Sequence, residues 1–482
     1  MRYVSTRGRA PALGFCDCLL AGLARDGGLY VPESWPQFSK VDIRALAGLS
    51  YADVAHRVMA PFVGNERDGG LSRDVLARLC HEAYARFQHK AVAPLTELAP
   101  NLWLLELFHG PTLAFKDYAM QLLGLLFDHV LAERGSRITI VGATSGDTGS
   151  AAIEACRDRD AIEMFILHPK GRVSEVQRRQ MTTVLSDNVH NIAVEGTFDD
   201  CQDLLKGLFN DGAFRDRVNL SGVNSINWAR VLGQIVYYFY AGVALGAPDR
   251  EIAFAVPTGN FGNIYAGFAA KTMGLSIHHL ALVTNRNDIL SHFLASGRLA
   301  IGAVEPSLSP SMDIQVASNF ERYLFELYRR DGGALAADVE TFRRERVLAV
   351  AEPRVREARA FFDGARVSDE DTVETIARLH RETGAILDPH SAVAVAGAER
   401  CRRDTSVPMV AVATAHPAKF PDAVERAIGV RPTLPPRLGD LFKRPERVTT
   451  LANDIAALKG FILDRVEGGN VVGGRQAEGG RP

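Results

Sequence analysis

The sequence has almost no net charge, few cysteines and no apolar run long enough to cross a membrane. Its 55 basic and 57 acidic side chains leave a net charge of −2 over 482 residues, so it offers no basic surface for the phosphates of a nucleic acid. The best apolar stretch, residues 235–247, is shorter than the roughly 20 residues that span a bilayer. The N-terminal residues contain no apolar signal core. We therefore predict a soluble, cytoplasmic protein that binds neither nucleic acid nor membrane.

Cysteines are few, and their spacing does not indicate a metal site. The six of them include no Cys-x-x-Cys pair, which fits neither a zinc site nor a dense disulfide framework. We expect reduced thiols and no metal. The remaining composition, 47% apolar and 23% charged, is typical of a soluble enzyme, and the length allows roughly two to four domains.

Short apolar runs alternate with helical patterns from about residue 137 onward. Each run is nearly continuous in apolar residues, as expected for parallel strands that helices cover on both faces. Periodicity also predicts a helix over 117–133, a surface helix that begins at Thr197 and a buried helix over 228–245. The pattern indicates an α/β fold. The predicted strands are 137–143, 162–168, 188–194, 251–256, 277–284 and 407–413.

Changes in pattern divide the chain into segments. The block 285–371 breaks the strand rhythm and carries arginine-rich helical patterns over 320–330 and 340–359, which predicts a helical insertion or small domain. The glycine-rich end lacks periodic apolar positions and is predicted to be a mobile tail. The predicted segments are an N-terminal domain (1–98), the first part of an α/β core (99–284), the insertion (285–371), the remainder of the core (372–466) and the tail (467–482).

Lys116 stands at the end of the string FHGPTLAFKD, residues 108–117, directly before the predicted helix. A lysine with the usual pKa near 10.4 is almost fully protonated at neutral pH, so use as a nucleophile requires help. A helix N-terminus disfavours the ammonium, and burial among apolar neighbours would add to that effect. Lys116 is therefore a candidate covalent lysine, with an exposed lysine at a helix start as the alternative.

Two glycine-rich loops each follow a predicted strand and precede a predicted helix, the place where open α/β sheets bind ligands. They are GATSGDTG, residues 142–149, and PTGNFGN, residues 257–263. Small residues let backbone N–H groups converge on a carboxylate or phosphate, although each loop could also be a tight turn. Neither matches a dinucleotide or nucleotide-triphosphate motif. A reactive lysine together with a loop for a monoester phosphate suggests pyridoxal phosphate.

Ten motifs together resemble, in order, those of the long form of threonine synthase, and they span about residue 5 to 440. That family is of the fold type II pyridoxal-phosphate enzymes, related to tryptophan synthase β and cysteine synthase. The resemblance implies a tryptophan synthase β-like α/β fold of open parallel sheets, with an extra N-terminal domain and a helical insertion. The motifs are FHGPTLAFKD, GATSGDTGSAA, HPKGRVSEVQRRQMTT, NIAVEGTFDDCQDL, NSINWAR, VPTGNFGN, TNRNDIL, SPSMDIQVASNFER, LDPHSAV and ATAHPAKFP.

The resemblance also implies roles for particular residues. Lys116 would form the Schiff base with the cofactor and act as the catalytic base, and Thr414 would meet the pyridine nitrogen. Asn224 and Arg230 would bind a phosphate of the substrate, with Arg230 as a bidentate donor. The residues implied to cradle the cofactor phosphate are Gly259, Asn260, Phe261, Gly262 and Asn263. Those implied to bind the substrate's carboxylate are Thr144, Ser145 and Thr148.

The implied reaction is that of a lyase in the last step of threonine biosynthesis, a β,γ-replacement that converts O-phospho-L-homoserine and water to L-threonine and phosphate. The alternatives are another lyase of the same fold, such as a serine/threonine dehydratase, and a non-catalytic pyridoxal-phosphate-binding homologue. Arg230 favours the β,γ-replacement, because the substrates of a serine/threonine dehydratase carry no γ-phosphate. Asp147 has no assigned role, since relatives such as cysteine synthase have asparagine there. We expect a monomer or small homo-oligomer.

Overall fold

The computed structural model describes residues 1–473 and divides the chain into two compact units. Unit 1 comprises Met1–Leu123 and Ser225–Arg437, and unit 2 comprises Gly124–Asn224 and Leu438–Pro482, of which 474–482 lie outside the described residues. One crossing between the units falls inside a continuous helix, α5 (Lys116–Arg134). The unit boundaries therefore differ from the segment boundaries that the sequence pattern suggested.

The sheet of unit 1 has the strand order β13-β10-β9-β14-β4-β3. All neighbouring pairs are parallel except β3 and β4. In the centre of the sheet, Ala411 of β14 pairs with Leu104 of β4 and with Ala255 of β9. The strands are β3 (Leu95–Ala99), β4 (Leu102–Glu106), β9 (Ile252–Pro257), β10 (Ile277–Thr284), β13 (Phe362–Arg366) and β14 (Met409–Ala413).

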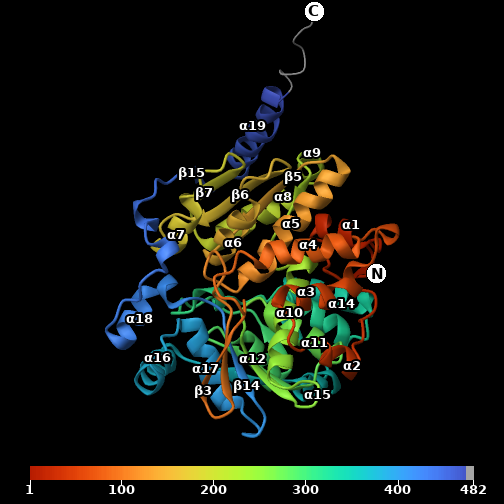
Figure 1. Cartoon of the computed structure of the whole chain (residues 1–482). Coiled ribbons are helices and arrows are strands. Elements are labelled where there is room, and N and C mark those ends of the chain that lie inside the picture. Colours follow the sequence, from red (N-terminus) through yellow and green to blue (C-terminus); the bar gives the residue numbers. More distant parts are fainter. Residues whose placement is uncertain (474–482) are drawn as a thin grey trace, which may run out of the picture. The chain divides into compact units, whose positions relative to one another are not determined.

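Helices bury both faces of this sheet at its central strands, which is why β9 and β14 are buried throughout. On one face α17 (Pro389–Cys401) packs on β9, β10 and β14, and α16 (Asp369–Thr383) packs on α17 (Figure 1). On the other, α11 (Gly262–Thr272) packs on β9 and β10, and α10 (Trp228–Ala244) packs on α11 and on α3 (Tyr51–Val63). The predicted buried helix over 228–245 is thus confirmed. The other helices of unit 1 are α1 (Phe15–Ala21), α2 (Lys40–Arg44), α4 (Arg73–Tyr84), α12 (Ile289–Ser296), α13 (Phe320–Leu327), α14 (Gly332–Glu345), α15 (Glu352–Phe361) and α18 (Pro421–Ile428).

The block 285–371 is not purely helical. Residues 362–366 form the edge strand β13, and a small antiparallel pair joins β11 (Arg298–Ala300) to β12 (Val347–Ala349). β12 also interrupts the helical pattern that was predicted over 340–359. The sequence FDGAR of β13 has no β-branched residue and contains glycine, so propensity argues against a strand. These residues form a strand because their backbone pairs with β10.

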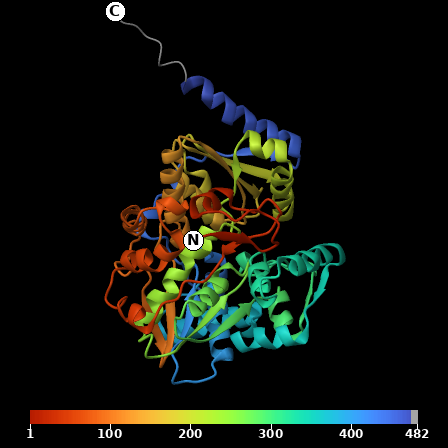
Figure 2. The ribbon, with the colours of Figure 1, turned by 90° about the vertical axis from the view of Figure 1, so that its right-hand side faces the viewer.

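Unit 2 contains a second parallel sheet, in the order β15-β7-β6-β5-β8. Its buried strands pack against α8 (Phe198–Asn210), whose apolar stripe was predicted, and α19 (Ile455–Gly473) lies beside α8 (Figure 2). The other helices are α6 (Asp147–Cys156), α7 (Glu175–Thr182) and α9 (Gly212–Arg217). The strands are β5 (Ile138–Ala143), β6 (Ile162–Pro169), β7 (Val189–Glu195), β8 (Leu220–Ser221) and β15 (Thr449–Ala452).

The C-terminal segment begins as helix. α19 continues through residues 467–473, the first part of the predicted tail, and 474–482 lie outside the described residues. No helix within residues 1–473 is long and apolar enough to cross a membrane. All six cysteines are free thiols, and five of them are buried.

Candidate active site

Three neighbouring strands of unit 1 end at one edge of the sheet, and each leads into a predicted site residue or loop. β9 runs into the loop 258–263, β14 runs into Thr414, and β4 runs into the segment that ends at Lys116. Carboxyl ends of adjacent parallel strands lie side by side, so the three elements converge. The fold thus brings together the residues that the sequence predicted for the cofactor.

Backbone hydrogen bonds join the Lys116 segment to the Thr414 segment. The N–H of Phe115 donates to the carbonyl of Thr414 at 2.8 Å, and the N–H of His416 donates to the carbonyl of Leu113 at 3.0 Å. Lys116 is the first residue of α5, as predicted, and is only 8% exposed. Lys116 therefore directly follows the residue whose backbone N–H binds the Thr414 carbonyl, and it is largely desolvated.

Asp117, next to Lys116, is completely buried and organises the loop before the helix. Its carboxylate accepts from the backbone N–H of Thr112 at 2.8 Å and from the Thr112 hydroxyl at 2.7 Å. A Cβ on Gly110 would lie 2.5 Å from the Asp117 side chain, so only glycine fits there. On the other side, the ammonium of Lys419 donates to the carbonyl of Thr112 at 2.7 Å. These contacts fix the backbone from which Lys116 projects.

Replacement of Thr112 by valine is expected to destabilise the protein by about 2 kcal/mol, because a buried hydrogen bond to a carboxylate is lost without a change in shape. Thr112→Ser keeps the hydroxyl and should cost less. Urea unfolding of both variants checks this. Equal losses for valine and serine would mean that the methyl group, not the hydrogen bond, is what matters.

The loop 258–263 presents the N-terminus of α11 at the sheet edge. Phe261, its N-cap, has φ 62°, and no acidic residue lies in the first turn of the helix. The first N–H groups of a helix have no acceptor within it, so this end suits an anion. From the block 285–371, Asn319 donates to the Asn260 carbonyl with both its backbone N–H and its side-chain amide, each at 3.1 Å. That block therefore helps to hold the loop, a role that the sequence did not reveal.

Asn263 supplies a further observation in favour of a bound ligand. Its side-chain oxygen accepts from the hydroxyls of Tyr237 at 2.6 Å and Tyr238 at 2.9 Å. Its Nδ2 group is buried and has no hydrogen-bond partner within residues 1–473. Such a donor in the first turn of a helix fits an acceptor-rich group such as a phosphate.

Thr414 is buried and lies two residues before His416 in the chain. Burial, and to a smaller extent the proximity of His109, lower the pKa of His416 to about 4, so this imidazole is uncharged at neutral pH. The Nδ1 atom of His416 accepts from the backbone N–H of Ala418 at 3.1 Å. A hydroxyl such as that of Thr414 does not force the protonation of a pyridine nitrogen as a carboxylate would.

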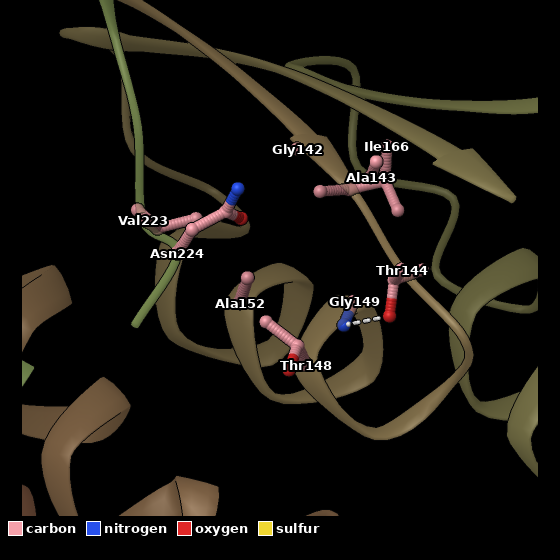
Figure 3. Close-up of a pocket in the computed structure, with 9 residues that line it drawn as sticks. All are labelled: Gly142, Ala143, Thr144, Thr148, Gly149, Ala152, Ile166, Val223 and Asn224. Carbon is pink, nitrogen blue, oxygen red and sulfur yellow. Dashed lines mark hydrogen bonds between the residues drawn. The ribbon is translucent and has the colours of Figure 1, made fainter. Parts of the chain in front are cut away.

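The other glycine-rich loop lies in unit 2, between β5 and α6. Thr144 Oγ1 accepts from the backbone N–H groups of Gly146 at 2.9 Å and Gly149 at 2.8 Å, and this second bond is drawn in Figure 3. Gly146 has φ 137°, which favours glycine. Thr144 therefore shapes the loop as well as being a predicted ligand residue.

Asp147 has a clear structural partner. Its carboxylate oxygen accepts from the side-chain amide of Gln177 at 2.8 Å. The same Gln177 side chain fills the space above Gly146, where an added Cβ would lie 2.3 Å from it. Gln177 lies within the motif HPKGRVSEVQRRQMTT, but nothing in the sequence predicted its contact with Asp147. Asp147 is thus held by α7 within unit 2.

Three of the five predicted substrate residues line one pocket of unit 2. Thr144, Thr148 and Asn224 lie around a shallow hollow with Gly142 and Gly149, and the amide of Asn224 points into it (Figure 3). Ser145 belongs to the same loop and is half-buried. Most of this loop is buried, and Ser145 and Thr148 are its partly exposed residues.

Arg230 belongs to unit 1 and lies in the first turn of α10. It is 3% exposed, and burial lowers the pKa of its guanidinium to about 10, so the group stays protonated at neutral pH. Asn227 caps the helix, accepting from the N–H of Ala229 at 3.0 Å. Arg230 is thus a protonated guanidinium in the first turn of a helix, a group that can donate two parallel hydrogen bonds to a phosphate.

Three further residues of the matched motifs have structural partners. His109 contacts Glu106 at 2.7 Å, and exposed Lys170 contacts Glu195 at 3.1 Å. His390 is buried against Asp388. None of these contacts requires a ligand.

The parallel α/β sheet and the lysine that converges with a glycine loop at its edge define a class, the pyridoxal-phosphate-dependent enzymes of fold type II. A family model described as "Pyridoxal-phosphate dependent enzyme" matches residues 88–358, which confirms the predicted cofactor and fold. Models for the N terminus and the C-terminal part of threonine synthase match residues 2–84 and 391–462. The chain belongs to the threonine synthase family.

Similar proteins cover almost the whole chain. The threonine synthase of Pseudomonas aeruginosa is 57% identical over 463 residues, which are 96% of this chain and 98% of that protein. A crystal structure of threonine synthase from Brucella melitensis with pyridoxal phosphate bound has a TM-score of 0.93 at 52% identity, and covers 97% of this chain and 99% of that one. Threonine synthase from yeast has a TM-score of 0.91 at 38% identity, with the same coverage.

Proposed function

We propose that the chain converts O-phospho-L-homoserine and water to L-threonine and inorganic phosphate. The convergence of Lys116, the loop 258–263 and Thr414 at the ends of three adjacent strands carries this proposal, together with membership of the family. This geometry suits a cofactor whose phosphate, ring nitrogen and carbonyl carbon are each bound by a different one of these three elements.

The residues of unit 1 bind and orient the cofactor. Lys116 bonds covalently to it, the N–H groups at the start of α11 and the free amide of Asn263 bind its phosphate, and the Thr414 hydroxyl meets its ring nitrogen. Several charge-assisted hydrogen bonds to the phosphate, each worth about 1.5–3 kcal/mol, retain the cofactor while Lys116 is released. When bound, pyridoxal phosphate supplies an electron sink for the bonds at the substrate's α-carbon.

Lys116 then moves protons. Once the substrate amine has replaced it, its amine is free to remove the proton from Cα, and the position at a helix N-terminus and the low exposure favour the neutral amine.

The substrate's charged ends require anion donors. Thr144, Ser145 and Thr148 of the unit 2 loop bind the α-carboxylate, and Asn224 and Arg230 donate to the γ-phosphate. Arg230 favours this function over that of a dehydratase, because substrates such as serine and threonine carry no γ-phosphate for a guanidinium to bind. The proposal includes a cytoplasmic location, which the six free thiols support, and a monomeric or small homo-oligomeric state.

The function is tested with the purified protein loaded with pyridoxal phosphate. It is incubated in parallel with O-phospho-L-homoserine, O-phospho-L-serine and L-threonine, and phosphate, threonine and 2-oxobutanoate are measured. We expect threonine and phosphate in equal amounts from the first substrate alone. Release of 2-oxobutanoate from threonine at a comparable rate would instead identify a dehydratase.

Replacement of Gly259 by alanine is expected to weaken cofactor binding by about tenfold or more. A Cβ there would lie 2.6 Å from the carbonyl oxygen of Ser311 and 3.3 Å from Cα of Met312, so the loop must shift. Titration with pyridoxal phosphate measures the effect, and Gly460→Ala, in α19 where a Cβ meets no atom within 4 Å, is the control. An unchanged affinity would remove this loop from its proposed role.

A further inference from the structure

A buried aspartate and histidine form a hydrogen-bonded pair at the start of α17 in unit 1. The Nδ1 atom of His390 lies 2.7 Å from Oδ2 of Asp388, and the two side chains are 3% and 0% exposed. Asp388 is also the N-cap of the helix and accepts from the backbone N–H of Ser391 at 3.0 Å. The imidazole packs on the ring of Phe420, with the centroids 4.7 Å apart. The pair is rigidly held, and the proposed reaction does not use it.

The hydrogen bonds of His390 define its tautomer. The backbone N–H of Ser311 lies 3.2 Å from Nε2, and because an N–H can only donate, Nε2 accepts. The proton of the neutral ring is then on Nδ1, where it is donated to Asp388. The line of contacts runs from Asp388 through His390 to the backbone of Ser311.

Ser311 belongs to the short turn Pro310–Met312, which packs directly on the loop 258–263. No side chain separates the two backbones, since a Cβ on Gly259 would lie 2.6 Å from the Ser311 carbonyl oxygen. On its far side the turn is held by Asn285, whose amide donates to Ser309 Oγ at 3.0 Å. A displacement of Ser311 would therefore pass directly to Gly259.

We infer that His390 is a positioning residue for the cofactor's phosphate, acting through the N–H of Ser311 and the turn Pro310–Met312. The inference rests on the proposed function, because it requires the phosphate to bind at residues 259–263. Asp388 contributes by holding the imidazole in the tautomer that accepts. His390 itself contacts neither substrate nor cofactor.

Two substitutions at one position separate the two hydrogen bonds of the ring. In His390→Gln the side-chain oxygen can reach the place of Nε2 and accept from Ser311, whereas in His390→Asn the shorter amide can reach only Asp388. Both remove the aromatic contact with Phe420. A difference between the two variants therefore reports the hydrogen bond to Ser311 and not the loss of packing.

The readout is the affinity for pyridoxal phosphate relative to that for pyridoxal, which lacks the phosphate. We expect His390→Asn to weaken binding of pyridoxal phosphate about three- to tenfold, the effect of one hydrogen bond, while affinity for pyridoxal is unchanged. His390→Gln should stay within about twofold of the unaltered protein. Ser391→Ala, which contacts Asp388 from the other side, should not change the ratio.

Equal affinities of the asparagine and glutamine variants, or an equal loss for pyridoxal, would overturn the inference. If His390→Asn does not fold, His390→Leu removes the acceptor for the Ser311 N–H while it keeps an apolar side chain against Phe420, and it carries the same expectation. The Gly259→Ala variant separates the two levels of failure. If it weakens binding and His390→Asn does not, the positioning role is wrong and the proposed cradle stands; if neither does, the cradle itself is wrong.

Discussion

Replacement of Lys116 by alanine is expected to lower turnover by roughly 10³-fold or more, because both the covalent attachment of the cofactor and the catalytic base are lost. The visible absorption of the lysine-bound cofactor should disappear at the same time. Asp117 and Thr112 hold the backbone at this point, so the alanine variant should keep the fold of the loop.

Two further variants sharpen this prediction. Lys116→Arg keeps the charge but cannot form the covalent bond, and it should behave like alanine. Lys271→Ala removes another partly buried lysine, whose ammonium donates to the carbonyls of Ile277 and His278, and should leave the visible absorption in place. An unchanged spectrum of Lys116→Ala would exclude Lys116 from its proposed role.

Replacement of Arg230 by leucine is expected to lower kcat/KM for O-phospho-L-homoserine by about 100-fold or more. A buried guanidinium in the first turn of a helix, which burial leaves protonated with a pKa of about 10, offers two parallel hydrogen bonds to a phosphate. Arg230→Lys should recover only part of this loss, since an ammonium provides a point charge in place of a planar fork.

The control for Arg230 is a ligand without a phosphate. Binding of L-threonine, followed by the change in cofactor absorption, should be the same in Arg230→Leu as in the unaltered protein. Equal losses for threonine and for O-phospho-L-homoserine would indicate a general structural role. A kcat/KM that does not change would remove Arg230 from the phosphate site.

Much of the fold follows from local sequence pattern. The runs over 138–143, 162–169 and 252–257 are buried parallel strands because helices cover both faces of their sheets, and continuous apolar sequence reports that directly. The helix that follows Lys116 was predicted from its three- and four-residue apolar spacing, and the helix after residue 263 from the glycine loop before it. These are local signals, and they predicted the elements that carry the proposed cofactor residues.

What the sequence could not show depends on contacts between distant residues. β13 has poor strand propensity and exists because β10 offers a parallel edge. The bond from Gln177 to Asp147 and that from Ser311 to His390 join residues 30 and 79 positions apart. Polar residues of these types are more often on the surface, so their burial is visible only once the fold is known.

The central claim is that the phosphate leaves from Cγ of the substrate and that water adds to Cβ. The fate of the water oxygen tests this claim most directly. The holoenzyme is incubated with O-phospho-L-homoserine in water enriched in the heavy oxygen isotope, and both products are analysed by mass spectrometry. We predict label in the hydroxyl of threonine and none in the released phosphate. Labelled phosphate accompanied by homoserine would show that the phosphorus–oxygen bond is cleaved instead, and would contradict this account.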